Sequence, residues 1–186
     1  MANVSEKFGL KPVRKIDGSP FINAQNRYRI ASGYGTAIFQ GDLVTPVAAG
    51  GIERHTANST TAVVGVFNGV FYTDPTTSKP TWKNYYPGSI SASDIIATVL
   101  DDPDLVASID SDGAFAVADI FKNFSVTNVT GNTNSGTSKV QLDYSVSGTA
   151  STFVIQAIDI SQNVDNSDAG SANVNVLVRI NNHFYR

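Results

Sequence analysis

The chain has 186 residues, a formal net charge of −3 and no cysteine, which excludes a disulfide framework, a thiolate metal site and a cysteine nucleophile. Glycine and small polar residues are abundant, a composition typical of one domain built from short strands and many turns. No apolar run approaches about 18 residues and the N-terminus is charged, so we expect neither a membrane span nor a secretion signal.

Charge is unevenly distributed along the chain. Residues 1–29 hold six basic and two acidic side chains, whereas residues 30–186 hold seven basic and fourteen acidic side chains. A basic arm on an acidic body is typical of proteins that dock onto an acidic partner. A solvated terminus without a partner is the alternative explanation.

Residues 1–25 are expected to form an extended arm, because Pro12 and Pro20 exclude a long helix. The segment still contains six large apolar residues, more than a freely solvated tail needs. We therefore expect the arm to lie against its own body or against a neighbouring subunit. The residues that we predict to make this contact are Phe8, Leu10, Lys11, Arg14 and Lys15.

The body is expected to begin at residue 26 with short strands near 27–30, 36–47 and 52–55. The most strand-like segment of the chain follows at 61–74, where β-branched and aromatic residues occupy both alternating faces. A strand that is apolar on both faces is covered on both faces, so this segment is predicted to be a central strand.

Residues 74–88 are predicted to form a long loop with three prolines. A loop of this length is either functional or disordered, and its aromatic residues argue against disorder. Trp82, Tyr85 and Tyr86 are therefore predicted to form a contact surface or to plug one end of the body, and the sequence leaves both alternatives open.

Alternation predicts further strands within 93–100, 105–109, 140–146, 153–160 and 173–180. The spacing in 114–121 predicts one short helix, and the polar segment 123–138 is predicted to be a surface loop. The whole pattern indicates an all-β protein with about nine or ten strands. We predict an antiparallel β-sandwich or jelly-roll-like barrel over residues 26–186, an extended N-terminal arm over 1–25, and at most one short helix.

No pattern of residues indicates catalysis or a cofactor, and we expect the protein not to be an enzyme. His55 and His183 lack a second metal-ligating residue at the required spacing. The segment Asp110–Gly113 matches a fragment of a calcium loop, but Phe121 occupies the position where that loop needs glutamate, so no metal site is predicted. Because the body is acidic, we also expect no nucleic-acid partner.

Four segments of the chain are similar to sequences of one protein family: MANVSEKFGLKPVR (1–14), FQGDLV (39–44), VVGVFNGVFYTDPTTSKPTWKNYYPGS (63–89) and VLDDPDLV (99–106). They resemble tailed-bacteriophage virion proteins, which are usually small, cysteine-poor β proteins associated with the head. The similarity covers roughly the first 110 residues.

The resemblance implies a virion component that is made in the host cytoplasm and located on the capsid surface. The function we expect is that of a head decoration or cement protein, which binds the outer surface of the major capsid protein shell and bridges capsomers. Such a protein is expected to be a homotrimer or homodimer. The alternative is a receptor- or glycan-binding module of a phage fibre or tail, in which the aromatic loop stacks on sugar rings.

Overall fold

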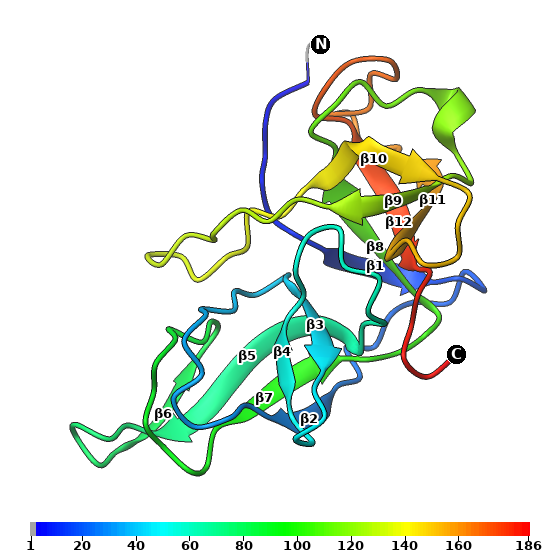
Figure 1. Ribbon diagram of the computed structural model, residues 1–186. Coiled ribbons are helices and arrows are strands. Elements are labelled where there is room, and N and C mark those ends of the chain that lie inside the picture. The colour runs from blue at the N-terminus through cyan, green and yellow to red at the C-terminus, as the bar shows by residue number, and fades with distance from the viewer. Residues whose placement is uncertain (1–2) are drawn as a thin grey trace.

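The computed structural model describes residues 3–186 and confirms the all-β class predicted from the sequence. Twelve strands form two six-stranded antiparallel sheets. The only helix in the described chain is one turn of 3-10 helix, η1 (Val117–Asp119), within the segment where one short helix is predicted. The two sheets make a sandwich-like arrangement without a closed barrel. In Figure 1 the sheet that contains β1 and β8 to β12, here called sheet A, lies above the sheet that contains β2 to β7, here called sheet B.

Sheet A contains β1 (Lys11–Lys15), β8 (Leu105–Asp110), β9 (Asn123–Val126), β10 (Leu142–Gly148), β11 (Ile155–Ile160) and β12 (Asn175–Ile180). Their order across the sheet is β1-β8-β12-β11-β9-β10. The sheet curls strongly, because an isolated bridge between Ser111 and Leu142 brings β10 back to the end of β8. Its inner face forms the first hydrophobic core, which also takes in Leu43, Val66 and Leu100 from sheet B.

Sheet B contains β2 (Asn26–Arg29), β3 (Leu43–Pro46), β4 (Ile52–Arg54), β5 (Gly65–Thr73), β6 (Pro80–Lys83) and β7 (Ile96–Leu100). Their order is β2-β7-β5-β3-β4, and β6 pairs with the second half of β5. All six strands lie between β1 and β8 in the sequence, so sheet B is an insertion into sheet A. Its inner face forms a second core around Phe67, Val70 and Tyr72.

Strand β5 belongs to both cores. Val66 packs in the first core and Phe67 in the second, because successive side chains of a strand point to opposite faces. Gly65 is required at the start of the strand, since a Cβ there would collide with the carbonyl oxygen of Leu100. β5 is therefore central, as predicted. Only its first half is covered on both faces, however, because Phe71 is 43% exposed.

Three strands form where the sequence analysis predicts none. β6 lies in the predicted loop 74–88, and β9, which is buried throughout, lies in the predicted surface loop 123–138. β1 lies in the predicted arm and pairs with β8, so Lys11–Lys15 are part of sheet A. A division into arm and body at residue 25 therefore does not describe this part of the fold. Residues 1 and 2 of the predicted arm lie outside the described residues.

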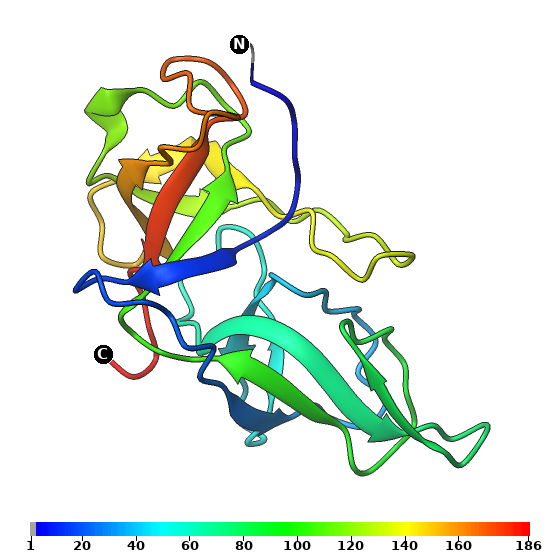
Figure 2. The same ribbon diagram turned by 180° about the vertical axis from the view of Figure 1, so that it is seen from behind.

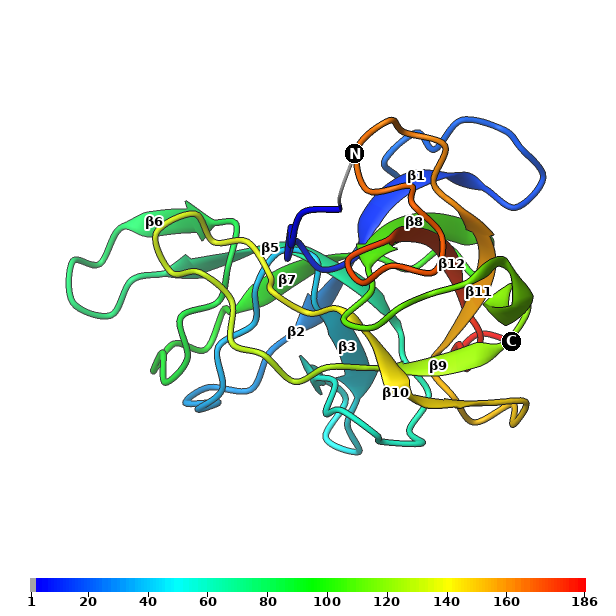
Figure 3. The same cartoon turned by 90° about the horizontal axis from the view of Figure 1, so that it is seen from above.

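Residues 3–10, here called the N-terminal strap, run down the side of sheet A to β1 (Figure 2). The loop between β11 and β12 lies beside the strap (Figure 3) and holds it. Asn166 Nδ2 donates a hydrogen bond to the Val4 carbonyl at 2.7 Å, and the Val4 N–H donates to Asn166 Oδ1 at 2.6 Å. Asn3 Nδ2 donates to the Ala172 carbonyl at 3.0 Å. The strap is thus fastened to its own chain.

Candidate functional site

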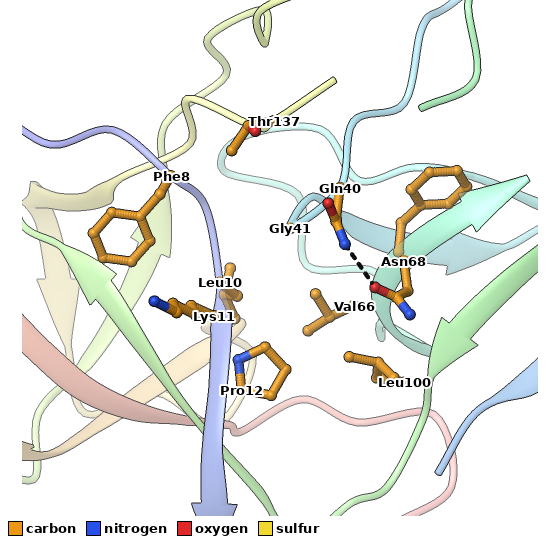
Figure 4. A pocket seen from close by; sticks show the side chains of 11 residues that line it. Phe8, Leu10, Lys11, Pro12, Gln40, Gly41, Val66, Asn68, Leu100 and Thr137 are labelled. Carbon is orange, nitrogen blue, oxygen red and sulfur yellow. Dashed lines mark hydrogen bonds between the residues drawn. The ribbon is translucent and has the colours of Figure 1, made fainter. Parts of the chain in front are cut away.

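A pocket of about 340 Å³ opens between the N-terminal strap and β5 (Figure 4). Phe8 and Leu10 lie on one side of it and Val66 and Leu100 on the other. The sequence analysis predicts Phe8, Leu10 and Lys11 as contact residues, and the structure brings all three to the wall of this pocket. The pocket lies near the lower end of the usual size range of ligand sites.

The rim of this pocket is polar. Gln40 Nε2 donates a hydrogen bond to Asn68 Oδ1 at 2.9 Å, and Asn68 Nδ2 donates to Gln25 Oε1 at 2.8 Å. Lys11 is the one charged residue among the described residues that line it. Because Phe8, Leu10, Val66 and Leu100 make its walls apolar, the pocket is suited to packing of an apolar group.

The five residues predicted for arm docking are largely used within the chain itself. Leu10 is 2% exposed and packs in the first core, so its predicted role in partner binding is wrong: a side chain buried in the core has no surface to offer. Lys15 Nζ lies 2.7 Å from Asp102 Oδ2, and Arg14 Nη1 donates to the Lys15 carbonyl at 3.1 Å. Of the basic residues of β1, only Lys11 is exposed without such a contact among the described residues.

The three aromatic residues predicted as a contact surface separate into two environments. Trp82, on β6, is 61% exposed. Tyr85 stacks on Phe39 with ring centroids 5.4 Å apart. Tyr86 is fully buried and donates a hydrogen bond to the Tyr34 carbonyl at 2.8 Å, so its predicted contact role is wrong. Residues 80–86 thus place Trp82 on the surface and Tyr86 in the second core.

Trp82 belongs to a row of side chains that crosses the outer face of sheet B. In the sheet register Phe71 is opposite Trp82, Ile96 is opposite Phe71, and Arg29 is opposite Ile96. The strand neighbours of Phe71, Ile96 and Arg29 pack in or against the second core, so these three side chains point away from it. Trp82 lies opposite Phe71 and is exposed. We call Trp82, Phe71, Ile96 and Arg29 the outer row.

Gly69 leaves room for the indole of Trp82 to lie close to β5. The indole of Trp82 lies over Gly69, where an added Cβ would come within 2.8 Å of the tryptophan Cζ2 atom. The next pair along the strands is Thr98 opposite Gly69, followed by Arg27 opposite Thr98. Two arginines therefore flank an apolar, partly aromatic surface.

Sequence reasoning finds Trp82 but misses the rest of the outer row. The sequence analysis places Phe71 on a covered face of the strand, because both faces of 61–74 are apolar. The pattern does not show that the second half of the strand is exposed on one face. The alternation Arg27-Tyr28-Arg29-Ile30 is the signal that points to arginines on one exposed face of an edge strand.

The two histidines considered above as metal ligands are packed inside the fold. His55 and His183 are both buried, and burial lowers the pKa of each; for His55 the value is about 4. Asp101 accepts hydrogen bonds from Asn26 and Tyr28. Within residues 3–186 no group of three or more His, Cys, Asp or Glu side chains is placed to hold a metal ion.

No family model, no curated protein and no solved structure matches this chain. In the described part of the chain there is no helix of the length and apolarity that crossing a membrane requires. The outer row is the feature from which a function is inferred.

Proposed function

We propose that the protein is a bacteriophage capsid decoration protein that binds the outer surface of the major capsid protein shell and bridges capsomers. The sequence resemblance described above suggests this class. The structural observation that supports it is the outer row, in which Trp82, Phe71 and Arg29 are presented together on one face of a rigid sheet.

The composition of this row suits a protein–protein interface. Tryptophan and arginine are enriched among the residues that dominate binding energy, and aromatic residues are enriched in interface cores. Trp82 and Phe71 are 61% and 43% exposed, so a partner can still cover much of both side chains. Because the row lies on strands and not on a mobile loop, little ordering entropy is lost on binding.

The charge of this face favours an acidic partner surface. Arg27 and Arg29 flank the row, whereas the chain as a whole has a net charge of −3. An acidic patch on the shell would attract this face and repel most of the rest of the molecule. Many copies bound to one shell, as homotrimers or homodimers at capsomer junctions, would strengthen an individually weak contact through avidity.

Co-sedimentation of the purified protein with heads of its parent phage, before and after shell expansion, tests this proposal. We expect saturable binding to expanded heads at a fixed ratio to the major capsid protein. The double variant Trp82→Ala/Phe71→Ser should bind about 30-fold more weakly, since interface aromatic residues contribute roughly 2 kcal/mol or more. Sedimentation equilibrium of the free protein gives its oligomeric state.

The matched control is Val117→Ser/Phe121→Ser, which removes two side chains that are 65% and 75% exposed, one in η1 and one shortly after it. The helical turn η1 lies far from β6 (Figure 1). This control should bind like the wild type. Absence of wild-type binding to either form of the head would contradict the proposed function. Equal weakening by both double variants would show that the outer row is not the docking surface.

A further inference from the structure

The segment that follows β12 connects the two sheets. Residues 181–186, here called the C-terminal clasp, leave the end of β12 in sheet A and run down toward sheet B (Figure 1). Val63, which lies just before β5 of sheet B, donates its N–H to the Asn182 carbonyl at 3.0 Å. The Val63 carbonyl accepts a hydrogen bond from the Phe184 N–H at 2.8 Å. The clasp is therefore fastened to the start of the central strand of sheet B.

Two weaker contacts hold the outer part of the clasp. The hydroxyl of Tyr185 lies 2.9 Å from the hydroxyl of Tyr28 on β2. Arg186 forms an ion pair with Asp104, and their side chains are 40% and 51% exposed. An ion pair as exposed as this one contributes little to stability. The contacts made nearer to β12 must therefore decide whether the clasp stays closed.

His183 lies at the centre of the clasp, beside Val63, and is 3% exposed. Its Nδ1 accepts a hydrogen bond from the Tyr185 N–H at 3.1 Å. A ring nitrogen that accepts a hydrogen bond carries no proton, so the imidazole is neutral with its proton on Nε2. Nε2 makes no hydrogen bond with any described residue. The closed clasp therefore requires the neutral form of His183.

The charged groups near His183 do not offset its burial. Three of them are carboxylates of the segment between β7 and β8, and the fourth is a guanidinium of the clasp; they are Asp101, Asp102, Asp104 and Arg186. Each carboxylate already has a partner, which is Tyr28, Lys15 and Arg186 respectively. Burial outweighs their attraction and lowers the pKa of His183 below its ordinary value of 6.5.

Protonation of His183 and closure of the clasp therefore oppose each other. A proton on Nδ1 removes the acceptor of the Tyr185 N–H and sets two donors against each other. It also places a positive charge in a buried site. When the clasp opens, the ring reaches water and its pKa returns to its ordinary value. Below pH 6.5, each further unit of acidification then favours the open form by up to about tenfold.

We propose that the C-terminal clasp is a pH-sensitive device that opens on acidification, when His183 takes up a proton at Nδ1. Opening releases the aromatic rings of Phe184 and Tyr185, which are 51% and 52% exposed in the closed form. Both sheets stay folded, because the ladders of β12 end at Ile180 and are not broken. This device goes beyond the proposed shell binding and does not rest on it.

Nuclear magnetic resonance of the full ¹⁵N-labelled chain, titrated from about pH 7.5 to about pH 4.5, tests the proposal. The imidazole nitrogen shifts report protonation of His183, and hydrogen-exchange protection factors report the Phe184 and Tyr185 amides. We expect the protection of both amides to fall by up to about tenfold per pH unit below pH 6.5 as His183 takes up its proton. Amides in the middle of β12 should keep their protection.

Three variants assign the response to one side chain. His183→Asn keeps an oxygen that accepts the N–H of the residue two positions on, as in an Asx-turn, but does not titrate, so its clasp should stay closed at every pH. Arg186→Gln removes the ion pair with Asp104 and should keep the pH response. His55→Leu removes the other buried histidine and should also keep it.

Four results would overturn the proposal. They are constant protection of both clasp amides in the wild type, an equal loss of protection throughout β12, a response that persists in His183→Asn, and a response that disappears in Arg186→Gln or His55→Leu. Circular dichroism shows whether His183→Asn folds. If it does not, the wild-type titration decides, because protonation of His183 without loss of protection at Tyr185 contradicts the coupling.

Discussion

Asp42 and Arg54 form a buried ion pair within sheet B, with Asp42 Oδ2 2.9 Å from Arg54 Nε and side chains that are 1% and 8% exposed. Asp42 also accepts hydrogen bonds from the Phe39 N–H and from Ser138 Oγ, at 2.9 and 2.5 Å. Arg54 Nη2 donates to the Val129 carbonyl at 2.6 Å. The pair therefore ties the start of β3 and the end of β4 to the long loop between β9 and β10.

Breaking this pair is expected to be costly. Asp42→Asn or Arg54→Met leaves one buried charge without its partner, so we expect a loss of about 3 to 5 kcal/mol in the free energy of unfolding, measured with urea. The control is Lys15→Met, whose partner is Asp102 and whose side chains are 32% and 17% exposed. That change should cost about 1 kcal/mol or less. Similar losses at both pairs would contradict the structural role given to Asp42 and Arg54.

Leu10 is expected to stabilise the fold and not merely to belong to a terminal arm. Leu10→Ala should lower the free energy of unfolding by about 2 to 5 kcal/mol, because it leaves a cavity in the first core. Val13, on the neighbouring β1, is 48% exposed, and Val13→Ala should cost much less. Thermal unfolding of both variants checks this. A Leu10→Ala variant as stable as the wild type would mean that the strap does not pack as described.

Acidification should destabilise the protein through His55. Burial lowers its pKa from 6.5 to about 4, so the folded state binds fewer protons than the unfolded state between these values. The contribution is fully present above pH 6.5 and is lost as the pH falls toward 4; it amounts to about 1 to 3 kcal/mol. His55→Leu should flatten this part of the stability–pH curve. An unchanged slope in the variant would contradict the prediction.

Asp110 should have the opposite effect on stability, lowering it as the pH rises. Burial outweighs the favourable influence of Gln141, Lys7 and the Glu6 N–H and raises the pKa of Asp110 from 3.8 to about 6. The folded state therefore retains a proton that the unfolded state releases, and stability is lost as the pH rises through 6.

Replacing the Asp110 carboxyl group with an amide should remove this loss of stability at high pH. Asp110→Asn keeps an acceptor for Gln141 Nε2, which now donates to Asp110 Oδ2 at 2.8 Å, and adds a donor that can face Asn175 Oδ1. We expect the variant to be more stable than the wild type at pH 8 by about 1 to 3 kcal/mol, and little changed at pH 4. Denaturation at both pH values measures the difference, and a variant less stable at pH 8 would refute it.

The strongly alternating segments predict their strands well, whereas strands of mixed composition do not. β9 reads Asn-Phe-Ser-Val within a run of small polar residues, yet all four residues are buried. Its polar side chains are accommodated individually: Asn123 Nδ2 donates to the Ala150 carbonyl at 3.0 Å, and Ser125 Oγ accepts from the Asn58 N–H at 3.0 Å. These long-range partners are invisible in a local pattern.

The other two strands that the sequence analysis misses, β1 and β6, lie at the edges of their sheets. β6 begins with Pro80, which lacks an N–H and is tolerated because the strand pairs on one side with β5 only. The aromatic residues of 74–88 are recognisable as important, but the strand and turn geometry decides that Trp82 points outward and Tyr86 inward. The outer row depends on register across four strands, which no single segment of sequence specifies.

The insertion of sheet B into sheet A has a consequence for the order of folding. Residues 26–100 contain every strand of sheet B and can pair as soon as they leave the ribosome, whereas β1 has no partner until β8 has been made. Leu10 therefore waits, unburied, through the synthesis of about half of the chain. Closing so long a loop makes folding slow, and the nascent edge of β1 is the part of the molecule most open to mispairing with another chain.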